Sequence, residues 1–388
     1  MSRDTPRVVT RPPPAGRSAG GRPAGPARHG HDGGTASGYH RPVQDPSSRE
    51  PHQPARGPDD IQEHVAGRAT GPLRPATGPR DSRRSAQRSD TAHPNAAPRH
   101  GSLDESECRV RFADFVRRPD ASIPLAEVCL CIAGVAPPAP ERDAALVELD
   151  TLAEQTRGRL PRGLGVLATP ETEVRDAQDL DIVIDALHET LYVDVGLRQA
   201  PRDLLDPRIG YLHEVLARRV GLPILLSVVE LEVAWRLGLP LHGVGLPGHF
   251  IVGGPDGLLV DPCDRGRRLT LDDCQALIRR STDRPVLLGP AMLRAATRRE
   301  ILARVLGNLR GIFLANRSWP GALWTLELLV LLDPRDPGLR RDRALLYGRV
   351  GRFTDAVHGL ERYLEEQPDA SDVDEVALAR GIFAGRRN

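Results

Sequence analysis

Apolar residues recur at helical spacing from about Phe112 to Ala200. The residues that fall at this spacing are Leu146, Leu149 and Ala153 in one run, and Leu180, Val183, Ile184, Leu187 and Leu191 in another. Positions three and four apart share one helix face, so both runs predict helices. A Gly- and Pro-rich stretch, Arg157–Pro170, separates them. We interpret this part as helical packing material that carries no chemistry.

The period of the pattern changes after this region. One helix that stops before Gly221 is predicted by the spacing of Tyr211, Leu212, Val215, Leu216 and Arg219. A second helix is expected over 224–237, with Pro223 near its start and Gly238 as its C-terminal cap. Strands are then expected over 241–246, 249–252 and 258–261, with a turn over 253–257.

The turn predicts which strand residues face each other. If the hairpin closes symmetrically on Pro255, Val252 faces Leu258, Ile251 faces Leu259 and His249 faces Asp261. A carboxylate beside an imidazole fixes its tautomer, as in the orienting half of a catalytic triad. A slip of one residue would place the two side chains on opposite faces.

The last part of the chain repeats itself with an offset of 34 residues. The matching pairs are Ile312 and Leu346, Phe313 and Tyr347, Trp319 and Phe353, Ala322 and Ala356, Leu326 and Leu360, Val330 and Leu364, and Pro334 and Pro368. A helix-turn-helix unit of this period is typical of tetratricopeptide repeats. Two such helix pairs are open to two interpretations: a peptide-binding concave face, or packing against the rest of the domain.

Composition changes the picture at the N-terminus. Residues 1–100 hold 16 Pro, 12 Gly and only six Leu, Ile, Val or Phe, and their net charge is +7 against −6 for the remainder. Such a segment cannot bury enough apolar surface to fold, so we expect a disordered arm over 1–105. A linker-like extension is favoured over a nucleic-acid-binding arm, because no aromatic residues are interleaved with the basic ones.

Several classes of protein are excluded or disfavoured. All 53 basic residues are Arg, so P-loop and Schiff-base lysine chemistry are ruled out. The five cysteines, Cys108, Cys129, Cys131, Cys263 and Cys274, are irregularly spaced and predict neither disulfides nor a metal site. Neither a signal peptide nor a membrane span is recognisable, so we expect a cytoplasmic protein with no membrane partner. We expect no cofactor.

One dinucleotide-like pattern does not fit its required context. Gly243, Gly245 and Gly248 satisfy G-x-G-x-x-G, but they lead into His249-Phe-Ile-Val, which is a strand pattern. A dinucleotide fingerprint must instead open a helix, whose N-terminus receives the phosphate. A nicotinamide or flavin enzyme is therefore not expected.

The motifs Gly221-Leu-Pro-Ile-Leu-Leu-Ser, Arg236-Leu-Gly-Leu-Pro, Leu246-Pro-Gly-His-Phe and Val260-Asp-Pro together resemble the SirB-type family. The resemblance covers roughly residues 108–375. It implies a divergent transglutaminase-like (papain-like) core followed by tetratricopeptide-like helices, with His249 and Asp261 matching the histidine and aspartate of the active enzymes. The family spacing implies that the nucleophilic cysteine of the active enzymes corresponds to Pro223. The nucleophile is therefore missing here, as it generally is in SirB-type proteins.

The functional hypotheses depend on the missing cysteine nucleophile. Thiol chemistry needs an activated thiolate, which proline cannot supply. Ser227, one turn further along the helix, and Cys263, two residues past Asp261, are the alternative nucleophiles for a hydrolase or acyl-transfer enzyme. The favoured hypothesis is a non-catalytic binding or regulatory protein with a protein or peptide partner, in which His249 and Asp261 are a structural pair. The third hypothesis is a structural scaffold whose cleft has no function.

The fold class that follows is α+β. We expect a disordered arm over 1–105, a helical lead-in over 106–205, a transglutaminase-like core over 206–288, tetratricopeptide-like helices over 289–375 and a tail over 376–388.

Overall fold

The computed structural model describes residues 104–136, 141–162, 164, 177–282 and 285–387. The expected disordered arm lies outside the described residues, except for its last two positions. Among the described residues, no helix is long and apolar enough to cross a membrane. All five cysteines are free.

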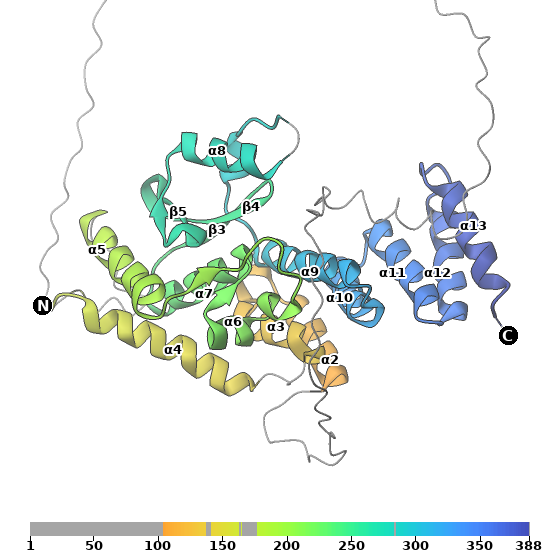
Figure 1. The fold of residues 1–388 in the computed structure, drawn as a ribbon, viewed down its shortest axis with the longest axis horizontal. Coiled ribbons are helices and arrows are strands. Elements are labelled where there is room, and N and C mark those ends of the chain that lie inside the picture. The colour runs from red at the N-terminus through yellow and green to blue at the C-terminus, as the bar shows by residue number, and fades with distance from the viewer. Residues whose placement is uncertain (1–103, 137–140, 163, 165–176, 283–284, 388) are drawn as a thin grey trace, which may run out of the picture. The chain divides into compact units, whose positions relative to one another are not determined.

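The lead-in and the start of the core are helical (Figure 1). The elements are α2 (Glu105–Val116), α3 (Leu125–Ile132), α4 (Arg142–Arg159), α5 (Ala177–His188), a π-helix η3 (Glu189–Asp194), a 3-10 helix η4 (Pro207–Gly210), α6 (Leu212–Arg218) and α7 (Pro223–Arg236). The residues that predicted helix faces lie in α4, α5 and the start of η3, and they are buried, apart from the half-buried Leu146. Arg219 and Gly238 adopt positive φ just after α6 and α7, which ends both helices.

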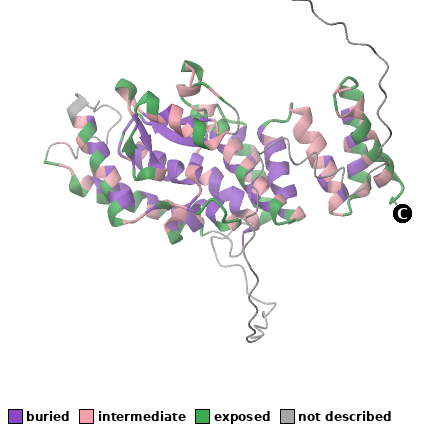
Figure 2. Cartoon of the chain, turned by 45° about the horizontal axis from the view of Figure 1, so that its top comes forward, coloured by how far each residue is buried: buried purple, intermediate pink, exposed green. Residues whose placement is uncertain are grey.

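Helix α7 is the centre of the core. All its residues from Ile224 to Ala234 are buried, and they belong to the purple interior in Figure 2. Just before α7, β2 (Val220–Gly221) pairs in parallel with β1 (Arg198–Gln199).

An antiparallel sheet packs on α7. Its order is β3 (His242–Leu246), β4 (His249–Gly253), β5 (Leu259–Asp261) and β6 (Arg267–Arg268). Side chains alternate between the two faces of the sheet. Phe250, Val252 and Val260 join the main core with α7, whereas Val244, Ile251 and Leu259 pack in a smaller cluster with α8 (Leu271–Ser281).

The predicted register of the second hairpin is wrong by two residues. Val252 pairs with Val260, not Leu258, and Gly253 pairs with Leu259. The turn is centred on Asp256 instead of Pro255, because Asp256 and Gly257 both adopt positive φ and the Gly254 N–H donates to the Leu258 carbonyl at 2.9 Å. A shift of two residues is one full period of a strand, so each side chain keeps its predicted face.

Five helices complete the chain, and they run one after another in Figure 1. They are α9 (Arg298–Ala315), α10 (Trp319–Leu332), α11 (Pro337–Arg349), α12 (Phe353–Glu366) and α13 (Val373–Ala384). Helices α10 and α12 begin at Trp319 and Phe353, at the offset that the sequence repeat predicts. The buried Trp324 of α10 donates its indole N–H to the Ile132 carbonyl at 2.8 Å, which ties the repeats to the lead-in.

Candidate functional site

His249 and Asp261 lie side by side at one end of the sheet. His249 begins β4 directly after Gly248, whose φ of +70° and close approach to Ser281 of α8 leave no room for a Cβ atom. The imidazole Nε2 donates to Asp261 Oδ1 at 3.0 Å, and both residues are buried. The structure therefore brings together the two residues that the sequence paired, by a diagonal contact and not by direct opposition.

Cys263 belongs to the same cluster. It lies in the 3-10 helix η6 (Pro262–Asp264), and its backbone N–H donates to Asp261 Oδ1 at 2.9 Å. Burial, followed by the charge of Asp261, raises the pKa of the Cys263 thiol. The thiol is therefore protonated at neutral pH, which is the opposite of an activated nucleophile.

Pro223 and Ser227 do not take part in this cluster. Pro223 is the first residue of α7, where its fixed φ suits the helix start. Ser227 is fully buried, and its hydroxyl donates to the Pro223 carbonyl at 3.1 Å, the preceding turn of its own helix. Among the described residues, no hydrogen bond joins either of them to His249.

Sequence reasoning missed a second polar cluster beside the first. Glu230 of α7 is fully buried, with Oε1 3.1 Å from His188 Nε2 and Oε2 accepting a hydrogen bond from the Tyr192 hydroxyl. Burial and the Glu230 carboxylate raise the pKa of Tyr192 well above its ordinary value. The available signal was a Glu in the middle of an apolar run, Val228-Val-Glu-Leu, since such a residue must find polar partners when its helix is buried.

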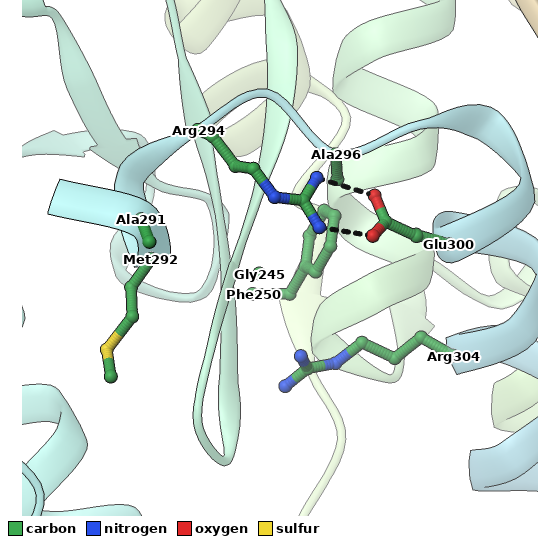
Figure 3. A pocket seen from close by; sticks show the side chains of 8 residues that line it. All are labelled: Gly245, Phe250, Ala291, Met292, Arg294, Ala296, Glu300 and Arg304. Carbon is green, nitrogen blue, oxygen red and sulfur yellow. Dashed lines mark hydrogen bonds and ion pairs between the residues drawn. The ribbon is translucent and has the colours of Figure 1, made fainter. Parts of the chain in front are cut away.

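Arg304 of α9 secures the turn that precedes His249. Its guanidinium donates to the Leu246 carbonyl at 3.0 Å and to the His249 carbonyl at 2.7 Å, and it stacks on Phe250. Arg304 also reaches into a cavity of about 200 Å³, which the Arg294–Glu300 ion pair borders on another side (Figure 3). This cavity lies on the Phe250 side of the strand, and neither His249 nor Asp261 lines it.

A larger hollow lies where the repeats meet the lead-in helices. This α2–α10 groove has a volume of about 710 Å³, within the range of ligand sites. Its apolar lining includes Tyr211, Phe313 and Trp324. Its charged lining consists of Arg109, Arg208, Arg352, Glu105, Asp206 and Glu327.

The glycines of the dinucleotide-like pattern have a different role. Gly243 and Gly245 lie in β3, and Gly248 forms the turn into β4. Strands lie on both sides of the turn, as the sequence predicted, so the pattern opens no helix. Gly243 is required by packing, since a Cβ atom there would lie 2.6 Å from the Phe250 ring.

Comparison with known proteins identifies the family. Residues 143–307 match the transglutaminase-like superfamily, and residues 309–380 match the tetratricopeptide repeat. A UPF0162 protein of Xylella fastidiosa is 36% identical over 216 residues, which cover 53% of this chain and 75% of that protein. The chain belongs to the UPF0162 family.

Two further proteins match part of this UPF0162 chain. A UPF0162 protein of Pseudomonas aeruginosa is 36% identical over 169 residues, covering 43% of this chain and 62% of the relative. Human F-box only protein 21 is 30% identical over 186 residues, which cover 44% of this chain and 28% of that protein. No solved structure matches the chain. The resemblance read from the sequence, a transglutaminase-like domain followed by tetratricopeptide repeats in a SirB-type family, is confirmed.

Proposed function

We propose that this chain is a non-catalytic binding protein that holds a peptide segment of a partner protein in the α2–α10 groove. The proposal that the protein is non-catalytic rests on the identity of the residue at the start of α7. Pro223 is the first residue of α7, and the spacing that the family resemblance implies puts the cysteine of the active enzymes at this position. Proline offers no nucleophile. The buried polar residues nearby are instead satisfied by one another, which supports a structural role for the His249–Asp261 pair.

An enzyme is the second candidate function because the Cys263 thiol lies close to the His249 imidazole. The ligand atoms of His249, Asp261 and Cys263 all lie within 4.8 Å of one another, so Cys263 is near an imidazole. A hydrolase or acyl-transfer enzyme would need that thiol as a thiolate, and burial beside Asp261 opposes its ionisation. Ser227 is a weaker candidate, because its hydroxyl is engaged with the Pro223 carbonyl.

The groove has features that suit a peptide. Trp324 is buried beneath the groove, and the Arg109 guanidinium covers its ring at 5.5 Å from the ring centroid. The accessible groups of the lining include arginines, a residue type enriched among those that dominate binding energy at protein interfaces. The charges of the lining are already paired: the partly exposed Arg109 contacts the buried Glu327 at 2.6 Å, and Arg208 contacts Asp206 at 2.7 Å. A groove with balanced charge favours a peptide of mixed polarity with an apolar anchor over a highly charged one.

Selection from a phage-displayed peptide library against the full chain tests this proposal. Peptides that are enriched should bind the unaltered chain and lose about tenfold or more in affinity when the groove is changed by Arg208→Ala or filled by Ser318→Trp. Arg362→Ala is the matched control, because Arg362 is an exposed arginine on α12 outside the groove. A failure to enrich any peptide, or binding that ignores both groove variants, contradicts the proposal.

A regulatory role, the cytoplasmic location and the residue limits of the domains stay predictions. The tetratricopeptide match supports an interaction role in general, since repeats of this kind commonly bind peptides. Nucleic acid remains a disfavoured partner.

A further inference from the structure

Three side chains with metal-ligating atoms converge at the end of the sheet. His249 comes from the start of β4, Asp261 from the end of β5 and Cys263 from η6. An imidazole nitrogen, a carboxylate oxygen and the thiol sulfur all lie within 4.8 Å of one another. His249 and Asp261 are buried, and Cys263 is the partly exposed member that connects the cluster to solvent.

The spacing of these atoms is close to that of a tetrahedral metal site. With zinc bonds of about 2.0–2.3 Å to nitrogen, oxygen and sulfur, the ligand atoms of a tetrahedral site lie about 3.3–3.8 Å apart. The present separation of His249 Nε2 and Asp261 Oδ1 is 3.0 Å, so these two atoms would need to move apart by a few tenths of an ångström. The Cys263 sulfur lies within 4.8 Å of the other two ligand atoms, so it would need to approach them by about 1 Å at most. A set of one imidazole, one carboxylate and one thiolate suits Zn²⁺ better than Mg²⁺ or Ca²⁺.

The charges around the cluster also favour a cation. Asp261 and Glu230 are both buried carboxylates, and their ion-pair contacts within 4.0 Å among the described residues are with histidines. In a chain with 53 arginines, neither carboxylate has an arginine partner in that part of the chain. Buried carboxylates are usually paired with a cation or coordinate a metal.

The ligands are held in place by their surroundings. The Cys263 N–H fixes Asp261, while Arg304 holds the carbonyl of His249 at 2.7 Å and so anchors the backbone of that ligand. Such contacts outside the ligand set orient the ligands of metal sites. Glu230 is occupied by His188 and Tyr192, which leaves the fourth position to water or to a donor from a partner.

We propose that His249, Asp261 and Cys263 form a binding site for one Zn²⁺ ion per chain. On binding, the Cys263 thiol gives its proton to solvent and its sulfur coordinates the metal. The proton on His249 Nε2 is exchanged for one on Nδ1, so the imidazole stays neutral and Nε2 coordinates. This proposal is independent of peptide binding in the α2–α10 groove, which lies among other residues.

Titration of the full chain with Co²⁺ under reducing conditions tests the site. Coordination by Cys263 should give a sulfur-to-cobalt charge-transfer band that saturates at one equivalent and disappears when Zn²⁺ is added. This band separates the cluster from the seven histidines of residues 1–100, because a site with nitrogen ligands alone has no such absorption. Absence of the band in the correctly folded wild-type chain overturns the proposal.

Variants locate the metal. Cys263→Ser should abolish the band, and His249→Gln should weaken Zn²⁺ binding about tenfold or more, as measured by competition with a chromophoric chelator. Cys274→Ser is the control, because Cys274 is a buried free cysteine of α8 outside the ligand set. Far-ultraviolet circular dichroism confirms that each variant is folded. A band that persists in Cys263→Ser places the metal elsewhere and refutes the proposed site.

Discussion

His249 and Asp261 are joined by a 3.0 Å hydrogen bond although they are not partners in the β4–β5 ladder. The observed register, extended along the strands, places Asp261 two residues away from direct opposition to His249. Cross-strand neighbours at this diagonal are about 7–8 Å apart in the backbone, a gap that an imidazole and a carboxylate can span. Asp261 also accepts the Cys263 N–H, so one carboxylate serves both the strand and the turn that follows it.

Removing the Asp261 carboxylate should therefore destabilise the fold. Asp261→Ala leaves the His249 imidazole and the Cys263 N–H without their acceptor, at an expected cost of about 2–5 kcal/mol in the free energy of unfolding. Asp261→Asn keeps an acceptor oxygen and should cost clearly less. Urea unfolding of the two variants without added metal measures the difference. Equal losses in both variants would show that the hydrogen bonds are not what stabilises this corner.

Glu230 should be a still more sensitive position. Glu230→Ala leaves His188 and Tyr192 without their shared partner in the interior, and we expect a loss of about 3–5 kcal/mol in the free energy of unfolding. Glu148→Ala is the comparison, because Glu148 pairs with Arg219 at a half-exposed surface site and should cost less than about 1 kcal/mol. Chemical denaturation of both variants gives the two values. A loss for Glu230→Ala as small as that for Glu148→Ala would mean that Glu230 contributes little to the free energy of unfolding.

Much of this architecture is encoded locally and could be predicted. The helix faces of α4 and α5 follow from apolar spacing, and the starts of α10 and α12 follow from the 34-residue repeat that begins with Trp319 and Phe353. The His249–Asp261 contact could also be anticipated, because the shift in register kept each residue on its predicted face.

Other features depend on information that local patterns do not carry. The centre of the hairpin turn was decided by the left-handed backbone of Asp256 and Gly257, and a turn containing Pro255 is compatible with either centre. The Glu230 cluster joins residues 42 and 38 positions apart, and no periodicity links a helix to partners at that distance. The groove is lined by helices that are far apart in the sequence, α2 and α10, so its lining becomes visible only in the fold.

Two glycines in the repeats should respond to alanine in opposite directions. A Cβ atom at Gly348 of α11 would lie 2.2 Å from the Phe383 ring of α13, so Gly348→Ala should destabilise the chain by about 1–3 kcal/mol. At Gly311 of α9 a Cβ atom would meet no atom of the described residues within 4 Å, and Gly311→Ala should stabilise the chain by about 0.5–1 kcal/mol through higher helix propensity. Thermal unfolding of the two variants is the measurement. Stabilisation by Gly348→Ala would argue against the close packing of α11 on α13, and destabilisation by Gly311→Ala would contradict the open surroundings of Gly311.

His213 should make stability depend on pH. Burial lowers the pKa of this imidazole, and neither ring nitrogen has a hydrogen-bond partner in the part of the chain that the structure describes. The unfolded chain therefore takes up a proton near pH 6.5, the ordinary value, while the folded chain resists it until a lower pH. The stabilising contribution is complete above pH 6.5 and is lost as the pH falls toward the lower pKa of the folded state. His213→Phe should flatten the fall in melting temperature between pH 7 and pH 5, and an unchanged slope would contradict this assignment.

The most direct measurement for the whole account is the reactivity of the two alternative nucleophiles. The full chain, treated with a chelator, is exposed at pH 7 to iodoacetamide and to a fluorophosphonate, and peptide mapping by mass spectrometry follows Cys263 and Ser227. We expect Cys263 to react more slowly than in the urea-unfolded chain, Ser227 to stay unmodified, and His249→Gln to change neither rate. Burial and the Asp261 charge raise the pKa of the Cys263 thiol, and the Ser227 hydroxyl is engaged with the Pro223 carbonyl. Rapid, stoichiometric modification of either residue that disappears in His249→Gln would show a nucleophile activated by the imidazole and would contradict the proposed non-catalytic role.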